Sequence, residues 1–94
     1  MVGARAANLL IRYIAGNVQK LRDERGLAQE QLAERADMHV TYLRKLERGS
    51  VNPSVRSLVA VAEALEVPLE SLFLPSIRRP PRAGRPPRNP KPTG

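Results

Sequence analysis

Apolar side chains recur at helical spacing between residues 4 and 73, and this pattern predicts a chain built from helices alone. The first helix is expected from about residue 4 or 8 to residue 25, where Gly26 suits a helix C-cap. The buried stripe of this helix has the spacing i, i+4 and i+7 and consists of Ile14, Val18 and Leu21. Gly16 lies inside the stripe and costs about 1 kcal/mol relative to alanine, so a break there is the alternative.

The segment before such a break, residues 1–13, is more apolar than a solvated extension requires. The side chains that make it so are Leu9, Leu10, Ile11 and Tyr13. Two interpretations stay open, because these side chains either pack on the core or contact another chain. The segment is accordingly expected as an N-terminal arm or as an extension of the first helix.

Two short helices joined by a tight turn are expected next. The second helix is predicted at about residues 29–35, with Leu32, Ala33 and Ala36 buried. The third is predicted at about residues 40–48 and ends at Gly49. At about 100° per residue, one face of the third helix is polar and cationic, and its residues are Val40, Thr41, Arg44, Lys45 and Arg48. The opposite face is apolar and consists of Tyr42, Leu43 and Leu46.

This division of the third helix indicates its role. A helix of this kind packs on a core with one face and offers three cations to a polyanion with the other. Together with the helix and turn before it, the segment indicates a helix-turn-helix that binds DNA.

Two more helices are expected after a loop at residues 50–53. The dipeptide Asn52-Pro53 is a turn signal, and Ser54 is a good N-cap for a fourth helix at residues 55–65. The apolar stripe of this helix consists of Leu58, Val61, Ala62 and Leu65. Pro68 suits the first position of a short fifth helix, which carries Leu69, Leu72 and Phe73. The apolar pattern stops after Leu74, so residues 14–74 are expected to form the folded domain.

The charge of the 94-residue chain is unevenly distributed. Residues 75–94 hold most of the nine prolines and six cations without an acid, so they account for most of the net charge of +7. We interpret them as a disordered tail rich in proline and arginine. The rest of the chain is almost neutral, but its cations gather around the third helix, as expected of a domain with one nucleic-acid face.

Composition also excludes several kinds of site. The chain has no cysteine, and hence no disulfide, thiol nucleophile or cysteine-ligated zinc, and His39 is its one histidine. No cofactor, metal site or catalytic constellation is expected, and neither is an enzyme. The apolar stretch at residues 6–15 is interrupted by Arg12 and is too short to span a bilayer. The expected location is therefore the cytoplasm, in association with the nucleoid.

Several motifs carry a resemblance to a known family. They are Leu21-Arg22, Arg25-Gly26-Leu27, Gln29-Glu30-Gln31-Leu32-Ala33, Thr41-Tyr42-Leu43, Leu46-Glu47-Arg48-Gly49, Asn52-Pro53-Ser54, residues 65–69 and Leu72-Phe73. From about residue 14 to residue 73 the chain resembles the Cro and phage-repressor helix-turn-helix proteins, the XRE family. The motifs of the third helix are similar to those of restriction–modification controllers. The resemblance implies an all-α, five-helix, lambda-repressor-like domain that binds double-stranded DNA at a partly palindromic operator as a homodimer and regulates transcription.

The resemblance also implies roles for individual residues. Base edges in the major groove would be contacted by Val40, Thr41, Arg44 and Lys45. The DNA phosphates would be contacted by Gln29, His39, Arg48, Ser50, Asn52 and Ser54, with helix capping as the other role for His39. A structural salt bridge would join Arg22 to Glu47. The dimer interface would be formed by Leu65, Leu69, Leu72 and Phe73, which are shared between core and seam.

The chain departs from the family pattern at several positions. Ala28 removes the usual side-chain cap of the second helix, which is worth about 1 kcal/mol. Asp37 and Glu66 stand where glycine is common, and aspartate tolerates a left-handed backbone better than most residues. Val40 cannot donate a hydrogen bond to a base edge, although it can contact a thymine methyl group.

Other functions are also consistent with the sequence. The main alternative is an antitoxin or adaptor that uses this fold to bind a protein partner through the arm or the tail. Another is an architectural binder with no sequence preference. The tail itself has three interpretations: a polycation that strengthens DNA binding, a minor-groove hook at residues 82–86, or a polyproline ligand for a partner domain.

Overall fold

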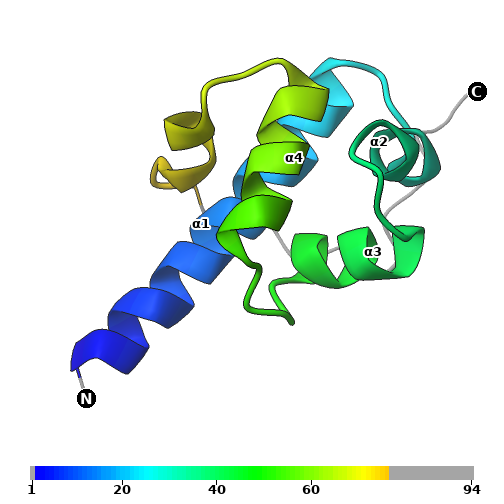
Figure 1. Cartoon of the computed structure of the whole chain (residues 1–94). Coiled ribbons are helices and arrows are strands. Elements are labelled where there is room, and N and C mark those ends of the chain that lie inside the picture. The colour runs from blue at the N-terminus through cyan, green and yellow to red at the C-terminus, as the bar shows by residue number, and fades with distance from the viewer. Residues whose placement is uncertain (1, 77–94) are drawn as a thin grey trace, which may run out of the picture.

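The protein is all helical over residues 2–76, the part of the chain that the computed structural model describes. Four α-helices, α1 (Val2–Glu24), α2 (Gln29–Arg35), α3 (Val40–Arg48) and α4 (Val55–Leu65), are followed by the short 3-10 helix η1 (Leu69–Phe73). Figure 1 shows α4 crossing the long α1, with α2 and α3 on one side of the crossing and η1 on the other. The expectations for residues 77–94 lie outside the described residues.

Helix α1 is continuous through Gly16, so the predicted break does not occur. Residues flanking this glycine are buried, among them Ala15 and Val18, and α1 packs there against α3 and η1. This packing outweighs the roughly 1 kcal/mol that glycine costs in a helix. Residues 2–13 are therefore an extension of the first helix.

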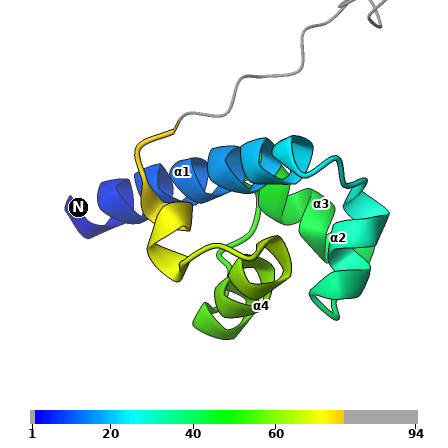
Figure 2. The ribbon, with the colours of Figure 1, turned by 90° about the horizontal axis from the view of Figure 1, so that it is seen from above.

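The extension does not pack on the core as a whole. Leu9 and Leu10 are each 41% exposed, while Ile11 and Tyr13 are half-buried. In Figure 2 the first turns of α1 project beyond the other helices. Packing on the core, one of the two interpretations of this segment, is therefore wrong for Leu9 and Leu10.

The core is formed by the apolar stripes of all five elements. Its largest fully buried apolar residues are Val18, Leu32, Leu43, Leu46, Val61, Leu65 and Leu72. Two of them, Leu65 and Leu72, were expected at the dimer interface. In the single chain both are buried, so of the four residues expected to be shared between core and seam these two belong to the core. Leu69 and Phe73 are half-buried and keep surface available.

The last element, where a short fifth helix was predicted, is a 3-10 helix, so the α-helices of the described residues number four. Pro75 restricts the residue before it to an extended backbone, and Leu74 has φ −66° and ψ 145°. Only five residues then separate this point from Pro68, and 3-10 helices, unlike most α-helices, occur in such short pieces. The buried side chain of Asn17 secures the segment, since its Nδ2 donates to the carbonyl oxygens of Leu72 (2.9 Å) and Leu74 (2.8 Å).

Four helix ends use a left-handed backbone, at Gly26, Asp37, Gly49 and Glu66. The two glycines adopt this conformation without steric cost. Asp37 (φ 55°) lies in the turn between α2 and α3, and Glu66 (φ 60°) is the C-cap of α4. These are the two positions where the sequence departs from glycine, so the structure retains the turn geometry despite the side chains.

Replacing Glu66 by glycine is expected to stabilise the protein. The left-handed conformation costs an L-residue about 1–2 kcal/mol, and the greater freedom of glycine in the unfolded chain offsets part of that gain. We expect Glu66→Gly to raise the free energy of unfolding by about 0.5–1 kcal/mol, measured by urea denaturation. Glu63→Gly makes the same change of charge on the exposed side of α4 and should instead lower it by about 1 kcal/mol. Effects of the same sign in both variants would contradict this account.

The N-termini of α4 and α2 are capped in different ways. Ser54 caps α4, because its Oγ accepts from the backbone N–H of Ser57 at 3.0 Å. Ala28 offers no side-chain acceptor to α2, but its own backbone N–H donates to Oε1 of Gln31 at 2.8 Å. The N-terminus of α2 is thus held by the third residue of the helix instead of by the cap.

Candidate nucleic-acid interface

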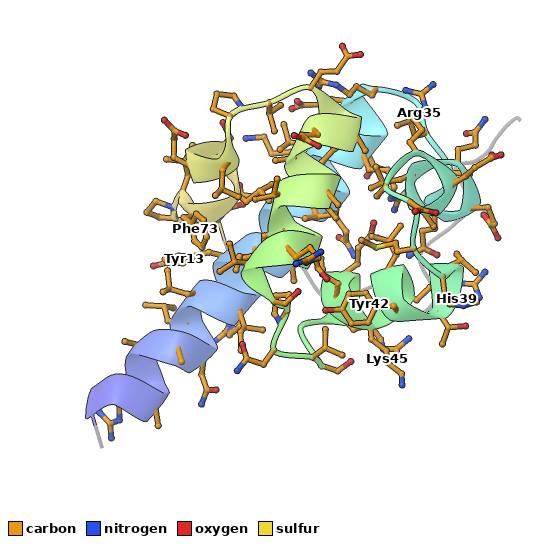
Figure 3. All side chains as sticks on the ribbon, viewed as in Figure 1. Tyr13, Arg35, His39, Tyr42, Lys45 and Phe73 are labelled. Atoms are coloured by element: carbon orange, nitrogen blue, oxygen red, sulfur yellow. The ribbon has the colours of Figure 1, made fainter. Side chains whose placement is uncertain are left out.

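Helix α3 turns one face to the core and the other to solvent. Leu43, Leu46 and Glu47 are buried against α1 and α2. On the opposite face Thr41, Lys45 and Arg48 are exposed, and Val40 and Arg44 are half-buried. Figure 3 shows Lys45 projecting away from the other helices. All five residues of the predicted polar face therefore share one accessible surface.

Four of the six residues predicted to contact phosphates flank the two ends of α3. His39 precedes the helix, and Ser50, Asn52 and Ser54 follow it; all four are exposed. His39 occupies the N-cap position, but its side chain makes no capping hydrogen bond. The capping role considered for His39 is therefore wrong.

Two of the loop hydroxyls already have partners within the chain. Ser50 Oγ donates to the carbonyl oxygen of Lys45 at 3.1 Å. Ser54 Oγ lies 3.0 Å from Ser57 Oγ as well as capping α4. A hydroxyl oxygen has two acceptor lone pairs and one donor, so both hydroxyls brace the loop while staying at the surface.

Arg22 and Glu47 form a two-pronged ion pair between α1 and α3. Arg22 donates from Nε to Glu47 Oε2 at 2.7 Å and from Nη2 to Glu47 Oε1 at 3.0 Å. The Glu47 side chain is 1% exposed and that of Arg22 is 15% exposed. Arg22 Nη1 also donates to the carbonyl oxygen of Leu27 at 2.8 Å. The pair thereby joins both helices to the loop before α2.

The hydrogen bond to Glu47 raises the pKa of the Arg22 guanidinium above its ordinary value. A raised pKa of a basic group adds stability at every pH below its unfolded-state pKa and loses it only as the pH rises through the folded value. For arginine this window lies in strongly alkaline solution. Arg22 therefore stays charged at any pH at which the protein would function.

The side chain of Gln29 lies inside the domain's polar network. Its Nε2 donates to Glu47 Oε1 at 3.0 Å, and its Oε1 accepts from Arg44 Nε at 3.4 Å. Arg44 Nη2 also lies 3.0 Å from Glu30 Oε2. The sequence assigned Gln29 to a phosphate contact and did not indicate its bonds to α3. Glu30 was not among the predicted site residues, since no local spacing relates residues on two different helices.

Other chemistry is not indicated near this surface. Among residues 2–76 no group of three or more His, Cys, Asp or Glu side chains is placed to hold a metal ion. None of the helices there is both long and apolar enough to cross a membrane. The exposed face of α3 combines cations with a rigid support, because the opposite face of the same helix is buried.

Comparison with known proteins decides the family. The helix-turn-helix family model HTH_3 matches residues 18–72 of this chain. The chain belongs to this family. As an XRE-type helix-turn-helix protein it is a DNA-binding transcriptional regulator, and the family is not a class of enzymes. The resemblance inferred from the motifs is confirmed.

The relatives of this helix-turn-helix protein include regulators and controllers. It is 38% identical over 69 residues to an uncharacterized HTH-type transcriptional regulator, y4dJ, from Sinorhizobium fredii, covering 73% of this chain and 90% of the relative. It is 37% identical over 60 residues to the control protein C.SmaI of Serratia marcescens, covering 64% and 71%.

A solved structure extends the likeness to the fold. The restriction–modification controller protein C.AhdI from Aeromonas hydrophila matches with a TM-score of 0.65 and 30% sequence identity. The match covers 67% of this chain and 96% of the controller. The arrangement of the helices is therefore that of a compact regulator of this family.

Proposed function

We propose that this regulator binds a partly palindromic operator as a homodimer, with α3 of each subunit in the major groove. The observation that carries the proposal is the division of α3 into a buried face and an exposed cationic face. Val40, Thr41, Arg44 and Lys45 are assigned to base edges. Gln29, His39, Arg48, Ser50, Asn52 and Ser54 are assigned to the phosphates around them.

Occupancy of the operator would be the regulatory mechanism. Two copies of α3 about 34 Å apart would enter successive major grooves on one face of DNA. The bound dimer would block or recruit RNA polymerase according to the position of the operator. No chemical step is required of the protein.

Selection of binding sites from a random duplex library, near physiological salt, tests the proposal. An enriched inverted repeat would support a dimeric reader of sequence and would supply the operator. Binding without enrichment would mean attachment to the DNA backbone alone and would overturn the proposal. Absence of binding would favour the alternative function, an antitoxin or adaptor, for which the exposed Leu9 and Leu10 offer an apolar contact surface.

The dimer seam is assigned to the outer side of η1. Leu69 and Phe73 are half-buried and the adjacent Leu74 is 57% exposed. We expect Leu74→Glu to weaken dimerisation by about tenfold or more, because a charge would be buried in an apolar interface, measured by sedimentation equilibrium. Val55→Glu changes an exposed valine at the start of α4 and should leave dimerisation unchanged. If the two substitutions weakened dimerisation equally, the assignment of the dimer seam to η1 would be contradicted.

The cations of the tail are expected to strengthen DNA binding without adding specificity. Ending the chain after Ser76 removes six cations and no acid. Each phosphate contact contributes roughly 0.9 to the log–log dependence of affinity on salt, so the slope should fall by up to about 5 per chain. Titrations of operator DNA between low and physiological salt would measure this slope. A change in the preferred operator sequence would contradict the assignment of the tail as a non-specific polycation.

A further inference from the structure

Arg44 is held by α2 on one edge of its guanidinium group. Its Nε donates to Gln29 Oε1 at 3.4 Å and its Nη2 to Glu30 Oε2 at 3.0 Å. The side chains of Arg44 and Glu30 are 43% and 66% exposed. Both contacts thus form at the surface where α2 and α3 meet.

The buried carboxylate of Glu47 determines the orientation of the Gln29 side-chain amide. Glu47 is buried and its ionised carboxylate can only accept hydrogen bonds, so the Gln29 atom that faces it must be the Nε2 donor. Gln29 Oε1 is therefore the atom turned toward Arg44. The buried ion pair between Arg22 and Glu47 in this way determines which atom supports the arginine.

These contacts leave a particular part of Arg44 free to bind. Nε and one hydrogen of Nη2 lie on the same edge of the guanidinium plane, and Gln29 and Glu30 engage that edge. The far end keeps both hydrogens of Nη1 and the second hydrogen of Nη2. Two parallel donors at the end of an arginine match O6 and N7 of guanine in the major groove.

We propose that Glu30, with Gln29, positions Arg44 for end-on recognition of guanine, which makes Glu30 a specificity-determining residue. This inference rests on the proposed DNA-binding function. An unsupported arginine on α3 would reach phosphates as readily as bases, and phosphate contacts carry no sequence information. Glu30 lowers affinity for DNA in general through its charge and raises discrimination by keeping Arg44 off the backbone.

The fold does not depend on Glu30. Ion pairs between exposed side chains contribute little to stability, so a substitution of Glu30 leaves the domain intact. Glu34 supplies a matched control, since it carries the same charge one turn later on α2 and is exposed. A change in DNA affinity that comes only from the loss of a negative charge will appear in the variants of both Glu30 and Glu34. A change that acts through Arg44 will appear only in the variant of Glu30.

The test compares Glu30→Gln and Glu34→Gln in the parent protein and in the Arg44→Ala variant. Affinities are measured by fluorescence anisotropy for the selected operator and for duplexes with each base pair substituted in turn. In the parent, Glu30→Gln is expected to lower discrimination at one G·C pair about fivefold to tenfold, the lower end of what a good bidentate contact supplies. Glu34→Gln should raise the affinity for all duplexes equally. In the Arg44→Ala background the two substitutions should behave alike.

Three results would overturn the proposal: unchanged discrimination in Glu30→Gln, an equal loss in Glu34→Gln, or a loss that persists without Arg44. Failure of the proposed function gives a different result. If the parent protein shows no sequence preference, the proposed operator-binding function itself is contradicted. That result is obtained from the parent alone, before any variant is compared. Circular dichroism of each variant confirms that the helices are intact.

Discussion

Replacing Arg44 and Lys45 together by alanine is expected to abolish operator binding while leaving the fold and the dimer intact. Both residues lie on the accessible face of α3, and neither belongs to the buried cluster. Since each good base contact is worth about 1–3 kcal/mol of discrimination, losing two should weaken binding by about a hundredfold or more. Fluorescence anisotropy with operator DNA measures the affinity, and thermal unfolding checks the fold.

The matched control removes two cations from elsewhere on the surface. Arg5→Ala with Lys20→Ala alters exposed positions of α1 by the same net charge. This variant should lose little affinity, through long-range electrostatics alone, and the loss should disappear at higher salt. Full biological activity of the Arg44 and Lys45 variant would contradict the assignment of α3 as the DNA-reading helix and would favour the protein-binding alternative.

Replacing Arg22 by alanine is expected to cause a large loss of stability. It would leave the Glu47 carboxylate, which is 1% exposed, without its charged partner. Breaking a buried ion pair by removing one side costs about 3–5 kcal/mol because the remaining charge is uncompensated. Urea denaturation should show this decrease in the free energy of unfolding, which is a large part of the total stability of a domain of this size.

Two further variants separate the ion pair from the side-chain volume. Arg22→Met combined with Glu47→Leu removes both charges and should recover most of the loss, as expected when a buried pair is replaced by apolar residues. Arg25→Ala removes an exposed cation near the end of the same helix and should change stability by less than about 0.5 kcal/mol. A loss below about 1 kcal/mol for Arg22→Ala would place the pair among weak surface bridges and would contradict this account.

The elements near α3 could be predicted from sequence because their signals are local. The rotation of 100° per residue places Thr41 and Lys45 opposite Leu43 whatever the helix packs against. Gly26 and Gly49 mark helix ends because few other residues adopt a left-handed backbone. Four of the five predicted helices were found as α-helices for this reason.

The predictions that the sequence did not support concern tertiary contacts, which decide whether a side chain is buried and which partner it has. Leu65 and Leu69 look alike in the sequence, yet only the first is buried in the single chain. Leu9 and Leu10 are apolar like the core residues, but they are exposed on the extension of α1. The contact between Arg44 and Glu30 depends on how two helices meet, which periodicity within either helix cannot report.

The amide of Asn17 holds the segment of the proposed dimer seam against α1. Its hydrogen bonds connect α1 to the carbonyl groups of Leu72 in η1 and of Leu74 just after it, and neither partner is among the residues of α3 assigned to DNA. Local opening of η1 would therefore withdraw the surface assigned to dimerisation while α2 and α3 stay packed. The dimer would respond first to mild heating or denaturant, and amide hydrogen exchange should be faster in residues 69–73 than in the buried turns of α3.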